Sequence, residues 1–121
     1  MVVASDAFKG SLTSLEVGDA VRLGLLDVAP HAEVVVVAVA DGGEGTVAAA
    51  LASGWAPVAV DVHGPTGEPV TATLAVRGTT VLVEMADACG LARLPDAVPA
   101  PLTASSRGLG EAIRAALEHG A

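Results

Sequence analysis

Residues 34–46 read VVVVAVADGGEGT, and this stretch decides the fold class. Its first six residues are almost all β-branched, which is typical of a strand covered on both faces in a parallel sheet. The glycine-rich polar residues that follow predict a loop at the carboxyl end of that strand. Open α/β sheets bind their ligands at this end. The stretch therefore predicts an α/β fold with a candidate ligand loop.

The residues before this stretch complete a βαβ unit. Val2 to Ala4 predicts a short buried strand, and the residues that follow have the apolar spacing of an amphipathic helix. Thr13 and Glu16 have the spacing of a capping box at its start, and Pro30 ends it. A short Ala-rich helix is predicted after the glycine-rich loop. The order βαβα indicates the start of a doubly wound, mostly parallel sheet.

The residues from 58 onward change from helical to extended periodicity. Three strands are predicted: Val58 to Val62, Val70 to Val76 and Thr80 to Met85. Their connections are too short for crossovers, which predicts an antiparallel meander. Residues 91–101 are predicted to be irregular, and a last helix starts near Gly108. We interpret residues 1–57 as the βαβα part and residues 58–121 as the meander plus helix, a portion of a second domain.

A βαβ sheet with only two or three parallel strands leaves strand edges and helix faces uncovered. More chain is therefore expected. The apolar residues are dominated by 25 Ala and 19 Val, which predicts a core of small side chains. These features together indicate an incomplete α/β fold.

Composition also restricts the partners and the compartment. The net charge of -8 is spread along the chain, which argues against nucleic acid and anionic membranes as partners. No apolar run approaches the roughly 18 residues of a membrane-spanning helix. No export signal is recognisable, and the single cysteine, Cys89, excludes an internal disulfide. These observations favour a cytoplasmic protein.

The loop between the first strand and the first helix contains Lys9, the only lysine of the chain. An ammonium group at this place can meet a phosphate, although position alone favours a solvated lysine. Gly10 and Ser11 can bring the backbone close to an anion near a helix start. The pattern is not a Walker A loop, and a turn with a capping region also accounts for Ser11.

The second loop places two carboxylates among three glycines. Asp41 and Glu44 suit a Mg²⁺ ligand or a base for a substrate hydroxyl group. The same spacing also fits a capping box, with Asp41 as the N-cap of the following helix. Spacing leaves both alternatives open.

Further candidates lie near the last helix and after the last strand. Arg107, among hydroxyl groups and glycines, can clamp a carboxylate or phosphate, although a solvated helix start is the alternative. Glu84, at the end of the last predicted strand, and Asp87, just after it, are candidates to face a ligand cleft.

Four blocks, in this order, resemble the first part of the bacterial glycerate/glyoxylate type of glycerate kinase. Residues 5–12 (SDAFKGSL) are similar to the family's Pro-Asp-Ser-Phe-Lys-Gly-Ser-Leu, and residues 40–46 (ADGGEGT) match its second signature. Residues 64–70 (GPTGEPV) and 84–91 (EMADACGL) follow at the expected distances. The chain departs from the family at Ser5, Ala7 and around Arg107.

The resemblance implies phosphorylation of D-glycerate by ATP, with Mg²⁺, in a cleft between two α/β domains. The product is phosphoglycerate, with 2-phosphoglycerate favoured, although the hydroxyl group that reacts and the oligomeric state stay open. Lys9 and Asp41 take the catalytic roles, and Asp41 or Glu44 is the metal ligand. The residues implied in substrate binding are Asp6, Ser11, Gly42, Gly43 and Arg107.

The family chain continues past residue 121, so we expect residues 1–121 to be inactive alone. Two alternatives stand beside the kinase: a non-catalytic α/β module that binds phosphate or a small carboxylate, and a structural fragment without activity. Binding of both MgATP and D-glycerate distinguishes the kinase from the module, which needs only one ligand.

Overall fold

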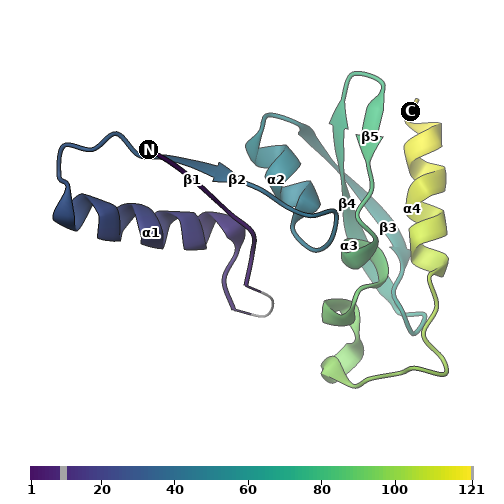
Figure 1. The fold of residues 1–121 in the computed structure, drawn as a ribbon. Coiled ribbons are helices and arrows are strands. Elements are labelled where there is room, and N and C mark those ends of the chain that lie inside the picture. The colour runs from purple at the N-terminus through teal and green to yellow at the C-terminus, as the bar shows by residue number, and fades with distance from the viewer. Residues whose placement is uncertain (9–10, 121) are drawn as a thin grey trace.

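The computed structural model describes residues 1–8 and 11–120, and its elements follow the predicted order (Figure 1). The first part consists of β1 (Val2–Ser5), α1 (Ser14–Val28), β2 (Val35–Ala38) and α2 (Thr46–Ala52). β1 and β2 pair in parallel, with Val2 opposite Val35. The predicted βαβ unit and the α/β class are therefore confirmed.

α1 begins at the predicted capping box. The hydroxyl group of Thr13 accepts a hydrogen bond from the Glu16 amide at 3.3 Å, and the Glu16 carboxylate accepts one from the Thr13 amide at 2.8 Å. The Thr13 hydroxyl group also donates to the Glu16 carboxylate at 2.8 Å. The bonds from the Thr13 amide and, after it, from the Thr13 hydroxyl group lower the pKa of the exposed Glu16 carboxyl. The helix ends at Val28, before Pro30. It lies close to β2, because a Cβ added at Gly18 would overlap Val36.

The second part is an antiparallel sheet with helices on it. The strands β3 (Ala56–His63), β4 (Pro69–Arg77) and β5 (Thr80–Leu82) are adjacent in this order, which confirms the meander. α4 (Arg107–Glu118) packs against β3 and β4. Two short 3-10 helices, Leu91–Arg93 and Pro95–Ala97, lie in the region predicted to be irregular.

The predicted third strand is too long. β5 ends at Leu82, and Met85–Cys89 forms the short helix α3 instead. Burial explains the difference: α3 places Ala88, 0% exposed, in the core next to α4, and packing of this kind overrides local preference.

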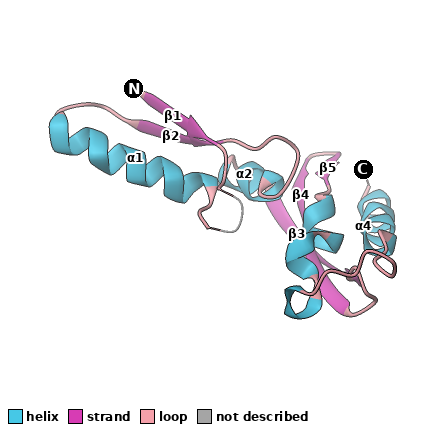
Figure 2. Ribbon diagram, turned by 60° about the horizontal axis from the view of Figure 1, so that its bottom comes forward, coloured by secondary structure: helices cyan, strands magenta, loops and turns pink. Residues whose placement is uncertain are grey.

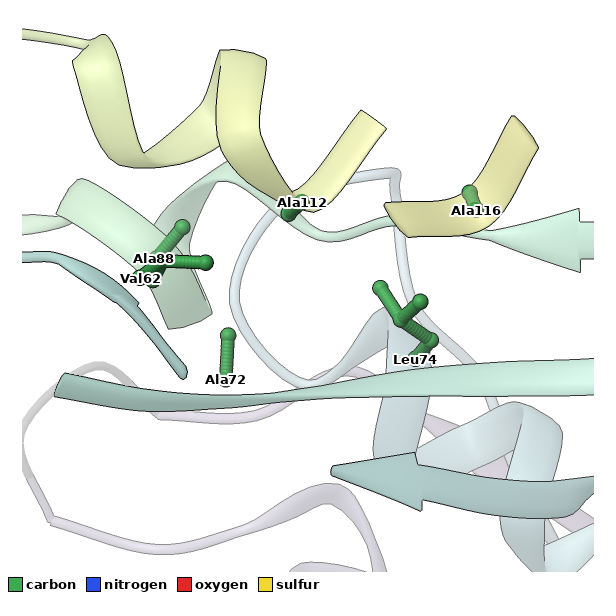
Figure 3. Close-up of a cluster of buried hydrophobic side chains, with 6 residues drawn as sticks. All are labelled: Val62, Ala72, Leu74, Ala88, Ala112 and Ala116. Carbon is green, nitrogen blue, oxygen red and sulfur yellow. The ribbon is translucent and has the colours of Figure 1, made fainter. Parts of the chain in front are cut away.

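The core is small and lies between the antiparallel sheet and the helices α3 and α4. Figure 3 shows its six residues: Val62, Ala72, Leu74, Ala88, Ala112 and Ala116. Leu74 is the largest fully buried side chain among the described residues. The predicted core of small side chains is confirmed.

The two sheets are connected through α2. α2 packs against β4, and Figures 1 and 2 show it between the βαβ unit and the antiparallel sheet, with α4 on the opposite side of that sheet. The division of the chain at residue 57 into parts of two domains stays a prediction. Within residues 1–8 and 11–120, no helix has both the length and the apolarity to cross a membrane.

Candidate active site

An open cavity of about 630 Å³ lies where the loops after β1 and β2 come together. Its lining comes from two stretches of the chain, between Asp6 and Leu15 and between Ala38 and Ala49. Both loops follow the carboxyl ends of parallel strands, the edge of an α/β sheet at which ligands bind. The cavity therefore joins the two loops that the sequence singled out.

The first loop is folded back on itself. The Phe8 amide donates to the Leu12 carbonyl at 2.8 Å, and the Ser11 hydroxyl group donates to the Phe8 carbonyl at 3.0 Å. One carboxylate oxygen of Asp6 accepts from the Ala7 amide at 2.7 Å. These bonds hold Asp6 and Ser11 in the cavity wall, together with the apolar side chains of Phe8 and Leu12. Lys9 lies outside the described residues.

Ser14 joins the start of α1 to the end of β1 and to the residue after β2. Its hydroxyl group donates to the Ser5 carbonyl at 2.5 Å and accepts from the Val39 amide at 3.2 Å. Ser14 also lines the cavity. Sequence reasoning missed this residue, because a serine in the first turn of a helix gives no signal of a partner on a distant strand.

The second loop is built on glycines and on local side-chain bonds. Gly42 and Gly45 have φ values of 97° and 93°, the left-handed region that glycine adopts without strain. The Asp41 carboxylate accepts from the Gly43 amide at 3.0 Å, and the Thr46 hydroxyl group donates to the Gly43 carbonyl at 2.7 Å. The loop thus presents Asp41 to the cavity.

The capping alternative for Asp41 and Glu44 is wrong. The N-cap of α2 is Gly45, which has no side chain that could accept a hydrogen bond from the helix amides. Instead, Glu84 reaches the start of α2: its two carboxylate oxygens accept from the Gly45 amide at 3.1 Å and from the Val47 amide at 2.9 Å. The sequence singled out Glu84 only by its position at the end of the last predicted strand. In the structure it bonds to the loop after β2 but does not line the cavity.

The structure brings most of the predicted residues together. Five of them line the cavity: Asp6, Ser11, Asp41, Gly43 and Glu44. Gly42 belongs to the same loop but does not line the cavity. Asp87 does not line it either: its carboxylate accepts from the Thr73 amide at 2.6 Å and forms an ion pair with Arg93.

Arg107 lies at the start of α4, away from this cavity. Its guanidinium donates to the Glu111 carboxylate at 2.8 Å. Glu111 also accepts from the backbone amide of His63 at 2.8 Å and contacts the His63 ring. The bonds from His63, and after them the bond from Arg107, lower the pKa of Glu111 to about 2. The structure thus gives Arg107 a partner that ties α4 to the end of β3.

The cavity lining is acidic. Asp6, Asp41 and Glu44 contribute carboxylates, and among the residues that the structure describes no Arg or His lines the cavity. In the described part of the chain, no group of three or more His, Cys, Asp or Glu side chains is arranged to hold a metal ion. Mg²⁺ commonly binds through one or two carboxylates together with substrate phosphates. The oxygens of Asp41 and Glu44 fit that mode.

Comparison with known proteins identifies the relatives of this chain. The family model described as the glycerate kinase family matches residues 1–121. Glycerate 2-kinase of Escherichia coli K12 is 44% identical, and glycerate kinase of Bacillus subtilis 168 is 42% identical; each alignment covers 100% of this chain. A solved structure from Salmonella typhimurium LT2, described as a candidate glycerate kinase 2, superposes with a TM-score of 0.73 at 42% identity over 98% of the chain.

The chain spans about a third of the length of these relatives. It covers 32% of each of the two enzymes and 33% of the solved chain. The shared part includes both loops of the cavity, since the alignments extend over the whole chain.

Proposed function

The chain belongs to the glycerate kinase family, and on this premise we propose that the full-length protein containing it transfers the γ-phosphoryl group of ATP to a hydroxyl group of D-glycerate. The observation that carries this proposal is the cavity, in which two loops with the motifs of the family face each other. Glycerate 2-kinase of Escherichia coli is among the relatives, so we propose 2-phosphoglycerate as the product.

Phosphoryl transfer depends mainly on positioning and on neutralisation of charge. In the proposed reaction, Asp41 accepts the proton of the attacking hydroxyl group or binds the metal ion, and Glu44 is the second candidate ligand. Mg²⁺, when bound, neutralises phosphate charge. Asp6 and Ser11 bind the substrate, and Gly43 lets the ligand approach the backbone closely. Gly42 contributes to substrate binding through the turn that its positive φ permits.

Lys9 is the proposed cation of this site, by resemblance to the family. Lys9→Met in the full-length protein should lower kcat/KM by about 10² or more, because a positioned charge is removed from the transition state. The matched control is Arg22→Met on the exposed side of α1, where Arg22 pairs with Asp19 at 3.1 Å. Equal activities of the two variants would remove Lys9 from the site.

A coupled assay of ADP release tests the reaction itself. Full-length protein with MgATP should release ADP with D-glycerate and much less with L-glycerate, and NMR of the product should show the phosphate on the 2-hydroxyl group. Isothermal titration adds the test against a non-catalytic module: both MgATP and D-glycerate should bind. Binding of one ligand without turnover would favour the module and contradict the kinase.

The proposal concerns a protein longer than residues 1–121. Because the chain spans about a third of the length of its relatives, we propose that residues 1–121 alone do not catalyse the reaction. The same assay of ADP release tests this. We also propose a cytoplasmic location, in keeping with a single cysteine that forms no internal disulfide. Fractionation of the native cells, with the kinase activity as the readout, tests it.

A further inference from the structure

Glu84 is a buried carboxylate outside the cavity whose bonds all lead to the cavity loop. The residue is 7% exposed, and its two oxygens accept from the amides of Gly45 and Val47. Among the residues that the structure describes, no basic side chain forms an ion pair with it. A buried carboxylate is costly unless it is hydrogen-bonded. The two amides therefore hold Glu84 in place, and Glu84 holds them.

The cavity loop needs such an anchor. Three of its residues are glycines, which have more backbone freedom to lose than any other residue. The first amides of a helix have no acceptor within the helix, and the N-cap of α2 makes no side-chain bond. Glu84 supplies the missing acceptors and puts a negative charge at the positive end of the helix.

Glu84 itself is fixed by the antiparallel half of the molecule. It stands two residues after the end of β5 and is the N-cap residue of α3. α3 is held in the core by Ala88, which is 0% exposed and packs in one cluster with Leu74 and with residues of α4. The anchor of the loop thus caps a helix, α3, that packs through Ala88 in the core shown in Figure 3, whereas the loop lines a cavity beside the parallel strands.

We propose that Glu84 is a positioning residue of the candidate active site. Through Gly45 and Val47 it fixes the loop that carries Asp41, although its own side chain does not line the cavity. The kinetic consequence of this inference rests on the proposed phosphoryl transfer. Its structural consequence, the ordering of residues 41–47, does not.

Glu84→Gln in the full-length protein is the test. A glutamine has nearly the same size, but its single acceptor oxygen serves only one of the two amides, and its NH₂ group faces the other. The matched control is Asp87→Asn on the same helix, because Asp87 also accepts from a backbone amide, that of Thr73, but does not bond to the loop.

Two measurements are made on each variant. We expect amide hydrogen exchange at residues 45–47 to be about tenfold faster in Glu84→Gln, the factor for loss of one hydrogen bond. We expect kcat with MgATP and D-glycerate to fall about tenfold or more, with a smaller change in KM, because misplaced groups reduce the rate more than binding. Asp87→Asn should change both readouts less than twofold.

Unchanged exchange or unchanged kcat in Glu84→Gln would overturn the inference. If the wild-type protein shows no turnover, the proposed kinase activity fails, while exchange at Gly45 and Val47 still decides whether Glu84 anchors the loop. If Glu84→Gln does not fold, amide hydrogen exchange of the wild-type protein decides. Slower exchange of the Val47 amide than of the Gly42 amide supports the anchor. Equal exchange rates of the two amides contradict it.

Discussion

Asp41 lies in the cavity wall with one oxygen bonded to the Gly43 amide, 3.0 Å away, so its structural and chemical contributions can be separated. Asp41→Asn keeps an oxygen that accepts this bond but removes the charge. We expect kcat/KM of the full-length protein to fall by about 10² or more, the usual contribution of a positioned acid or base, with Tm nearly unchanged.

The control for this variant is Asp61→Asn. The Asp61 carboxylate also makes a local bond, accepting from the Thr71 hydroxyl group at 2.9 Å, but it lies on β3 outside the cavity. It should leave the kinetics unchanged. Activity retained in Asp41→Asn, combined with a lower Tm in Asp41→Ala, would show that Asp41 only shapes its loop.

Residues of the site differ in how far the sequence predicts them. Asp6, Ser11 and Asp41 stand in motifs, so the sequence identifies them, and the order of a βαβ unit brings their loops to one edge. Ser14 and Glu84 are missed in these roles because their partners lie far along the chain; Glu84 and Val47 are 37 residues apart. No local pattern encodes a bond of that span.

At the scale of the elements, the contact between α4 and β3 depends on Gly108. A Cβ added there would overlap the carbonyl oxygen of His63, which is backbone and has little room to move. Gly108→Ala should therefore destabilise the protein by about 1–3 kcal/mol, as overpacking does. The measurement is the free energy of unfolding from urea denaturation.

Gly110→Ala is the matched control in the same helix. A Cβ added at Gly110 meets nothing within 4 Å. The substitution should therefore stabilise the helix by up to about 1 kcal/mol, because alanine has a higher helix propensity than glycine. If the two substitutions had the same effect, the close approach of α4 to β3 would be wrong.

The contact between α4 and β3 also predicts that the stability of the fold depends on pH. Bonds from His63 and Arg107 lower the pKa of Glu111 from 4.5 to about 2, so ionised Glu111 stabilises the fold relative to the unfolded chain. This contribution is complete above about pH 4.5 and is lost as the pH falls toward 2. We expect Glu111→Gln to flatten the fall of Tm between these pH values. An identical Tm profile in both proteins would contradict the assigned pKa.

Elements with a strong local signal were predicted, and those without one were not. Thr13 and Glu16 specify the start of α1 through bonds within one turn, so the sequence suffices. α3 has only five residues, too few to show helical periodicity, and it forms where Ala88 fills the core. Tertiary burial therefore explains why the sequence extended the third strand too far and missed α3.

At the scale of the whole molecule, the residues that the structure describes cover the two-stranded parallel sheet on one face only. Val36 faces α1, where it contacts Gly18, so its neighbours Val35 and Val37 point to the other face. They are 49% and 43% exposed, and Val2, opposite Val35 in the register, is 71% exposed. Contiguous exposed apolar side chains on a short sheet favour association.

We therefore expect residues 1–121, prepared alone, to self-associate through this face. Sedimentation velocity should show oligomers whose fraction grows with concentration, and Val35→Thr combined with Val37→Thr should reduce it, because threonine keeps the shape and strand preference of valine but adds a hydroxyl group. Val98→Thr is the control, since Val98 is 61% exposed but lies outside the sheets. A monomer at all concentrations, with a sharp two-state melt, would contradict this prediction. It would show that the core of the antiparallel half and the packing of α1 on the parallel sheet stabilise the fold without a partner on the exposed face.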